Sequence, residues 1–532
     1  MKKRIIAILL SVVMLFAFLA ACASDPPADT APGGDTAATT DGGETPDGAT
    51  PPGDNAVPAG DGGDHLIVVA RGLAVNMHPH EALDMNSAYI LNLVFDPLFR
   101  LNYETMEVEY ALAESSEMSD DATSLSIKLR EGVTFHNGDP VNAEVVRDSL
   151  LSTQNSPLVG FLIGMVDNIE VQDEYNLTIN LSGPFSPIRR HLTHSGTSIV
   201  HPDTTHDNPI GTGAYVWDSI VLGDRIELVA NENWWGDIAG ISRITWRAMP
   251  EGVARLIEVE TGGAHIAWDI NPSDLPRVEA DPNLTVHRNS SIETHFLAFQ
   301  CEKAPFDDIR IRHAIAYALD IPLLSYTAYE GTGTTADSFL TPIIVYHHSI
   351  PPRAQNLERA RELMAEAGYP DGFAVTLEFN SENQIYAQLA VMIASMLREI
   401  GIEAEILQFE WGAYLDRVLS GEHELMILSW NTITGDADYG LHDTHHSSGY
   451  PFGGNQSFYS DPATDALLEE GRRTLDSARR AEIYREVQEN AFEAANILNI
   501  HHDERLHAAV SNVRGFGVNP TGIIDLWNVY FD

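Results

Sequence analysis

Runs of apolar and alternating residues mark a series of strands in the first half of the chain. Residues 65–70, HLIVVA, form a short apolar run, which predicts a buried strand. Residues 123–138, TSLSIKLREGVTFHNG, alternate between polar and apolar positions and then reach Asn137-Gly138, so we expect a strand followed by a tight turn. NLTINLSGP at 176–184 predicts a further strand.

Apolar residues recur at three- and four-residue spacing in other segments, which predicts helices there. The clearest case is 385–400, where Gly401 ends the pattern, and 461–495 predicts two helices with a break near 474–477. Further helices are expected at 142–153, 307–320 and 357–373, and further strands at 402–409 and 424–430. The order strand, helix, strand between 373 and 430 indicates an α/β unit with a parallel sheet.

The first 22 residues have the pattern of an export signal. Lys2, Lys3 and Arg4 precede an almost wholly apolar run from 5 to 19, which is too short for a typical membrane span of about 20 residues. The run ends in Leu19-Ala20-Ala21-Cys22, which resembles the lipobox of bacterial lipoproteins, so we expect residues 1–22 to be a lipoprotein signal peptide and Cys22 to be lipidated. The alternative is a plain signal peptide that is cleaved at an Ala-x-Ala-like site.

Residues 23–64 are rich in Ala, Asp, Gly, Pro and Thr and contain no Lys, Arg or aromatic residue. Such a segment buries too little apolar surface to fold, so we expect a disordered acidic linker between Cys22 and the folded body. The other cysteine, Cys301, then has no disulfide partner, and we expect it to pack in or near the core. No later run of 18 apolar residues suggests a membrane span.

The net charge of the chain limits the kinds of molecule that it can bind. The 532 residues include 77 acidic and 31 basic side chains, which gives a formal net charge of −46. This charge argues against nucleic acid or an anionic lipid surface as a partner, and the length of the body suggests two or three domains.

Five blocks, in order, resemble one family. They are LREGVTFHNGDPVNAEVVRDSL (129–150), PIGTGAYVWDSIVLGDRIELVANENWWG (209–236), APFDDIRIRHAIAYALD (304–320), AGYPDGF (367–373) and YSDPATDALLEE (459–470). Together they are similar to the extracytoplasmic solute-binding proteins of peptide and nickel ABC importers, the family-5 group. The resemblance implies an α/β fold: a two-lobed, periplasmic-binding-protein-like clamshell of type II, in the large class with an extra inserted subdomain.

The resemblance also implies the division of the body. Lobe I would comprise 65–292 plus 505–532, with an inserted subdomain at 95–200, and lobe II would comprise 293–504. The two lobes of such proteins close on a ligand that lies between them.

Candidate ligand contacts follow from the same resemblance. In peptide-binding members an aspartate after a tryptophan segment holds the ammonium of the peptide, and the matching stretch here is LSWNTITGDADYGLHD (428–443). Asp436 is the first choice for this role and Asp438 the second, while Trp430 and Trp411 match aromatic positions that line the pocket. The alternatives are a solvated turn for the aspartates and core packing for the tryptophans.

One departure from the dipeptide-binding members is visible. They carry an arginine for the carboxylate of the ligand, whereas the matching region at 376–387 contains none. We therefore do not expect strict dipeptide specificity; longer peptides or another amine-bearing solute remain open.

A metal ligand is the second possibility within the family. His442, His445 and His446 cluster after the candidate loop, and imidazole suits nickel and zinc. They are weak metal candidates, because adjacent histidines rarely reach one ion and no spaced Cys or acidic ligands accompany them. A surface loop is the alternative.

The sequence contains none of the common catalytic motifs that we sought. HEALD at 80–84 lacks the second His of a zinc protease motif, and neither Gly-x-Ser-x-Gly nor a phosphate loop is present, so a secreted hydrolase is only an alternative from another class. We predict the substrate-binding component of an ABC importer, which captures a peptide or peptide-like solute outside the cytoplasmic membrane. Its partners would be the permease and ATPase complex and, through the lipid anchor, the membrane. We expect a monomer without a cofactor or nucleic acid; nickel or a metal chelate is the alternative ligand.

Overall fold

A computed structural model describes residues 63–82, 84–102, 105–450 and 454–532. These residues belong to one compact unit, Ala56–Asp532. The predicted signal peptide, Cys22 and almost all of the 23–64 linker lie outside the described residues. Among the helices that are described, none has both the length and the hydropathy needed to cross a membrane.

A large mixed sheet organises the described part of the chain. It contains 11 strands in the order β15-β14-β16-β12-β17-β11-β1-β10-β9-β8, and β13 pairs with β17 beside this path. The strands are β1 (His65–Ala70), β8 (Tyr215–Val221), β9 (Arg225–Ala230), β10 (Arg243–Ala248), β11 (Ile266–Ala267), β12 (Leu284–Phe299), β13 (Thr334–Thr335), β14 (Phe373–Asn380), β15 (Ile402–Phe409), β16 (Leu425–Asn431) and β17 (Ile497–Val510).

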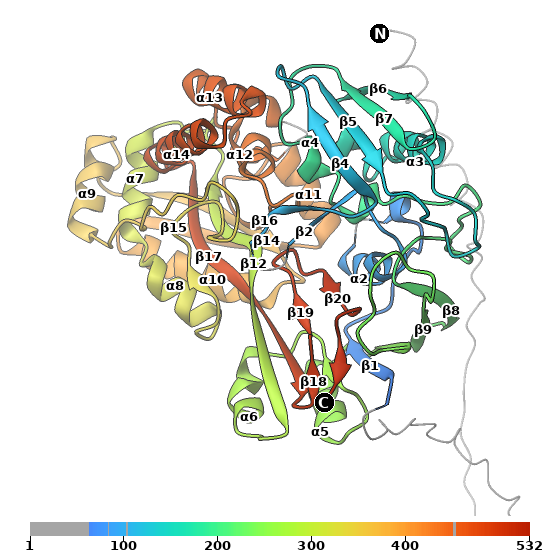
Figure 1. Cartoon of the computed structure of the whole chain (residues 1–532). Coiled ribbons are helices and arrows are strands. Elements are labelled where there is room, and N and C mark those ends of the chain that lie inside the picture. Colours follow the sequence, from blue (N-terminus) through green and yellow to red (C-terminus); the bar gives the residue numbers. More distant parts are fainter. Residues whose placement is uncertain (1–62, 83, 103–104, 451–453) are drawn as a thin grey trace, which may run out of the picture. The chain divides into compact units, whose positions relative to one another are not determined.

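Two long antiparallel strands join the two ends of this sheet (Figure 1). β12 and β17 pair from Leu284↔Val510 to Ala298↔Ile497, with register shifts between Ser290 and Thr294 and after His295. At one end β17 pairs with β11 of the N-terminal strands, and at the other end β12 pairs with β16. Irregular pairing in the middle of both strands frees their side chains from a strict ladder.

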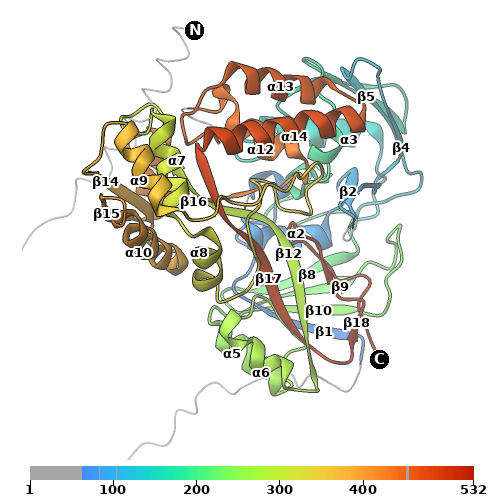
Figure 2. The same cartoon turned by 90° about the vertical axis from the view of Figure 1, so that its left-hand side faces the viewer.

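The predicted α/β unit is confirmed. β14 pairs in parallel with β15 and with β16, and the helix between β14 and β15 is α10, which begins after the cap residue Asn383. Helices pack around this end of the sheet (Figure 2). They are α7 (Ile309–Ala318), α8 (Ile321–Ala328), α9 (Leu357–Glu366), α10 (Gln384–Arg398), α11 (Trp411–Leu419), α12 (Ala437–His445), α13 (Pro462–Arg473) and α14 (Ser477–Ala494).

A separate four-stranded sheet lies within the segment predicted to be an insertion. Its order is β4-β5-β7-β6, and α3 packs on it to form one apolar cluster that includes Val146 and Leu150. The elements are β2 (Phe99–Leu101), β3 (Val108–Tyr110), β4 (Ala113–Met118), β5 (Ser124–Leu129), α3 (Ala143–Asn155), β6 (Val166–Val171), β7 (Asn176–Leu181) and α4 (Ile188–His191).

The remaining elements complete the N-terminal end of the large sheet. They are α2 (Met85–Val94), α5 (Gly252–Glu260), α6 (Leu275–Glu279) and four short strands after β17: β18 (Val513–Arg514), β19 (Gly517–Val518), β20 (Ile524–Asp525) and β21 (Tyr530–Phe531). Residues from both chain ends, such as Leu66 and Val529, share one apolar cluster there. The boundaries near 292 and 505 stay a prediction; they fall within β12 and β17, the strands that join the two ends of the sheet.

Candidate ligand-binding site

One cleft has the size and lining of a solute site. Its volume is about 570 Å³, within the range of small-molecule pockets. Its lining comes from α2, the start of the inserted segment, the middle of β12 and β17, the end of β16, and the C-terminal residues 519–527. Both ends of the large sheet therefore contribute to one cavity.

Aromatic side chains form one wall of the cleft. Trp430 at the end of β16 stacks on Tyr439 of α12 with ring centroids 5.7 Å apart, and Trp411 at the start of α11 is 42% exposed. Phe161 completes this wall, with its ring 6.4 Å from that of Tyr439. The two tryptophans singled out from the sequence thus line the cleft, and their contact with a ligand stays a prediction.

Another part of the cleft lining carries a neutralised charge pair, Asp96 and Arg100. Asp96 accepts hydrogen bonds from Thr212 Oγ1 (3.0 Å) and Trp235 Nε1 (2.9 Å) and forms an ion pair of 3.2 Å with Arg100. Arg100 in turn lies over the ring of Trp527 at 5.1 Å. These partners hold Asp96 and Arg100 in place, so we read them as structural parts of the wall.

Two charged side chains face the cleft from the long strands. Glu293 of β12 accepts a 2.7 Å hydrogen bond from Ser429 Oγ, and Arg505 of β17 lies in the same cavity. Burial alone would raise the pKa of Glu293, but His295 and Arg505 lower it, so the carboxylate is charged. Burial would lower the pKa of Arg505, but the groups around it, Glu293 among them, raise it.

Arg505 is half-buried, and part of its guanidinium group is enclosed without a partner. Its Nε is buried without a hydrogen-bond partner among the described residues, and none of their carboxylates lies within 4.0 Å of its side-chain nitrogens. Buried arginines are almost always paired, because an unmet charged donor is costly. An anionic group of a ligand would satisfy it.

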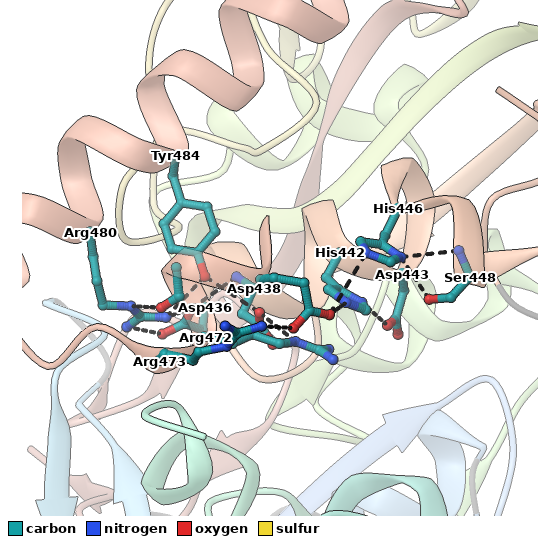
Figure 3. A network of polar contacts seen from close by, with 12 residues as sticks. Asp436, Asp438, His442, Asp443, His446, Ser448, Arg472, Arg473, Arg480 and Tyr484 are labelled. Atoms are coloured by element: carbon teal, nitrogen blue, oxygen red, sulfur yellow. Dashed lines mark hydrogen bonds and ion pairs between the residues drawn. The ribbon is translucent and has the colours of Figure 1, made fainter. Parts of the chain in front are cut away.

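Asp436 lies elsewhere, which corrects its sequence-based placement in the cleft. It is 1% exposed, caps the N-terminus of α12 and binds Arg480 of α14 at 2.8 and 3.1 Å, with Arg190 at 3.5 Å (Figure 3). Burial would raise the pKa of Asp436, but Arg480 and Arg190 lower it. Its charge is already matched by Arg480 and Arg190, so Asp436 is not free to bind the ammonium of a ligand.

Asp438 is corrected for the same reason. Its carboxylate is fully buried and binds Arg472 Nε at 2.9 and 3.2 Å, with the hydroxyl of Tyr484 at 3.4 Å (Figure 3). Neither aspartate lines the cleft. Both instead tie the first turn of α12 to α13 and α14.

The three candidate histidines separate into two environments, both outside the cleft lining. The rings of His442 and His446 stack 4.4 Å apart, and their Nε2 atoms lie 3.4 and 3.7 Å from Glu469 Oε1, so these three residues could hold an ion. His445 instead turns inward, with Nδ1 2.7 Å from Thr444 Oγ1. A second such group, Glu293, His295 and Asp503, lies on the long strands beside the cleft.

Cys301 fits its predicted place near the core. It is a free thiol packed against the apolar cluster of the helices and β14, and burial raises its pKa to about 12. A thiol that stays protonated is a poor nucleophile. This environment gives no support to the hydrolase alternative.

Three residues of the cleft were not expected from the sequence: Glu293, Arg505 and Tyr439. The available signal was a break in strand pattern: Glu293 in IETH and the three charged residues in HDERL interrupt two otherwise apolar or alternating segments. Charges in the middle of a long strand indicate that the strand leaves the core there.

Comparison with known proteins identifies the protein family. Residues 107–452 match the family model described as "Bacterial extracellular solute-binding proteins, family 5 Middle". This match spans more than half of the chain. The chain belongs to this family. Its members are binding proteins of ABC importers rather than enzymes, so the predicted role as a substrate-binding component outside the cytoplasm is confirmed.

Relatives and solved structures agree with this assignment. The glutathione-binding protein GsiB of Escherichia coli (strain K12) is 28% identical over 475 residues, which cover 85% of this chain and 92% of GsiB. The periplasmic binding protein DppA from Helicobacter pylori, in complex with peptide STSA, has a TM-score of 0.74 at 27% identity and covers 88% of this chain and 98% of its own. HbpA2 from Haemophilus parasuis has a TM-score of 0.81 at 24% identity and covers 88% and 100%. The predicted α/β, two-lobed fold class is confirmed by this likeness.

Proposed function

We propose that this protein captures a peptide or peptide-like solute in the cleft and delivers it to a permease with its ATPase. The observation that carries the proposal is a cleft of about 570 Å³ with one aromatic wall and two unlike charges, Glu293 and Arg505, on the strands that join the lobes. Peptide-like solutes combine apolar groups with a free ammonium and a free carboxylate, which match these walls. The named ligands of GsiB and of the DppA complex, glutathione and peptide STSA, are solutes of this kind.

Lobe closure is part of the proposal. Lobe I (65–292 plus 505–532, with 95–200 inserted) and lobe II (293–504) would move about β12 and β17, and Glu293 and Arg505 lie at those two boundaries. A ligand that contacts both lobes shifts the protein toward the closed form only by its preference for that form.

Binding measurements test the proposal directly. Calorimetric titration with glutathione and with di- to octapeptides should show a ligand, and Trp430→Ala should weaken its binding because the stacking face is lost. Tyr326→Ala is the control, since Tyr326 is 71% exposed on α8 and does not line the cleft. Absence of any binding by these solutes would contradict the proposal.

A metal chelate is the second candidate ligand. The observation that favours it is the group Glu293, His295 and Asp503, in which His295 Nε2 is buried without a described partner and lies 4.0 Å from Glu293 Oε1. The nearby cation Arg505 opposes it. Calorimetric binding of Ni²⁺ that is lost in His295→Ala but kept in His446→Ala would favour this candidate.

We further propose that the protein is a monomer anchored to the membrane by a lipid. Cys22 would carry the lipid and the 23–64 linker would tether the body outside the cytoplasmic membrane. Membrane fractionation should find the wild type in the membrane pellet and Cys22→Ala in the soluble fraction, and sedimentation of Cys22→Ala should give the mass of one chain. A Cys22→Ala protein that stays in the pellet would contradict the anchor.

A further inference from the structure

The charges at the crossing of β12 and β17 narrow the chemistry of the ligand, and this step rests on the proposed function. Arg505 has an unmet buried donor, and Glu293 has a carboxylate that is held charged. They do not form an ion pair with each other within 4.0 Å, yet they are close enough for each to shift the pKa of the other. Both side chains line the cleft, so a ligand group bound there can reach two opposite charges.

The partners of the two side chains differ. Ser429 Oγ donates to Oε1 of Glu293 and the side chain of Asn431 also hydrogen-bonds this carboxylate, whereas Nε of Arg505 has no partner among the described residues. Asp503 lies nearby on β17, and burial together with the charge of Glu293 raises its pKa. An ammonium ion beside Glu293 and Asp503 would relieve that repulsion, and a carboxylate beside Arg505 would accept from its free donors.

An ordinary α-linked peptide supplies these two groups far apart. Its ammonium is at one end and its main-chain carboxylate at the other, and the carbon that carries the ammonium is bonded to an amide. A free amino-acid head instead carries both charges on one carbon. A γ-glutamyl peptide has this head, because its chain continues from the side-chain carboxyl group.

We infer that the cleft recognises a free α-amino-acid head, as in a γ-glutamyl peptide, through Arg505 for its carboxylate and Glu293 for its ammonium. The remainder of the ligand then extends toward the aromatic wall of Trp430 and Tyr439. Arginine suits this role because its fork of donors matches both oxygens of a carboxylate.

A pair of isomeric ligands tests this inference without any mutation. γ-Glu-Ala-Gly and α-Glu-Ala-Gly have the same composition and formal charge, and only the first has an amino-acid head. By calorimetry the γ-isomer should bind between about tenfold and about a hundredfold more tightly, as expected for hydrogen bonds to a charged group. Equal affinities, or tighter binding of the α-isomer, would overturn the inference while leaving a peptide receptor in place. No binding of either isomer or of the wider peptide panel would instead overturn the proposed function.

Variants assign the preference to Arg505. In Arg505→Gln the ratio between the isomers should fall toward one, and in Arg505→Lys it should fall in part, because the charge remains and the fork is lost. Arg288→Gln is the matched control: Arg288 lies on β12, is 44% exposed and pairs with Glu279 and Glu504. Thermal melts of the unliganded variants report folding, and the lysine variant serves if the glutamine variant unfolds. A ratio unchanged in a folded Arg505 variant would overturn the assignment.

Discussion

At the scale of single residues, the buried pair of Asp436 and Arg480 shows how a charge can be structural. Asp436 is 1% exposed and Arg480 has a side chain that is 8% exposed, so each depends on the other for its charge. Asp436→Asn should lower the free energy of unfolding by about 3–5 kcal/mol, because Arg480 loses its main partner in the interior. Urea denaturation measures this change, and ligand affinity of the folded variant should stay as in the wild type. A weakened affinity without loss of stability would return Asp436 to the site.

The pH dependence of that loss has a definite sign. The pKa of Asp436 is lowered in the folded state, so its contribution is present above the ordinary aspartate value and disappears as the pH falls through the lowered value. The difference between wild type and Asp436→Asn should therefore shrink below about pH 4. Asp416→Asn, an exposed position on α11, should differ little from the wild type at any pH.

Asp525 is the opposite case. It lines the cleft at 5% exposure, and burial raises its pKa well above the usual range despite Arg100 nearby. Between the ordinary and the raised pKa the folded state holds a proton that the unfolded chain has released, so stability falls as the pH rises through this window. Asp525→Asn should match the wild type near pH 4 and exceed its stability at pH 7. Parallel stability curves for the two proteins would contradict this expectation.

At the scale of elements, two glycines test the turn between α9 and β14. Gly372 has φ +81° and a Cβ there would lie 1.7 Å from the carbonyl oxygen of Gly401, whereas Gly368 has φ +92° and open space around it. Gly368→Ala should cost about 1–2 kcal/mol through backbone strain alone. Gly372→Ala should cost clearly more, because the chain must also move away from Gly401. Denaturant melts of the two variants give the difference, and equal losses would show that crowding has no role.

The same elements show what pattern can predict. The helix α10 and strand β15 follow from regular spacing, since each buries one face or alternates along a strand. The break predicted near 474–477 is confirmed, since α13 ends at Arg473 and α14 begins at Ser477. β12 and β17 were not predicted. Each strand passes from the core of one lobe, along the cleft, to the core of the other, so its hydrophobic pattern has no single period. The ion-pair partner of Asp436 could not be predicted for another reason: Arg480 is 44 residues away in the sequence, and no local pattern links them.

At the scale of the whole molecule, the lobes are joined by continuous sheet rather than by loose linkers. β12 and β17 contribute to apolar clusters at both ends, through Leu284 and Leu506 at one end and Leu297 and Leu498 at the other. Loss of one lobe would therefore expose strands that the other lobe needs for its own core. This coupling favours unfolding in one step even though the chain is longer than a typical single domain.

Scanning calorimetry of the full chain tests this coupling. We expect one transition whose calorimetric and van't Hoff enthalpies agree, and a ligand at about 100 times its dissociation constant should raise the stability of the whole unit by roughly 2.7 kcal/mol. Trp430→Ala should keep the single transition and lose much of the ligand-dependent shift, since Trp430 lines the cleft and is not part of the β12–β17 pairing. Two resolved transitions, with the ligand moving only one, would show that the lobes unfold separately and that the long strands do not couple them.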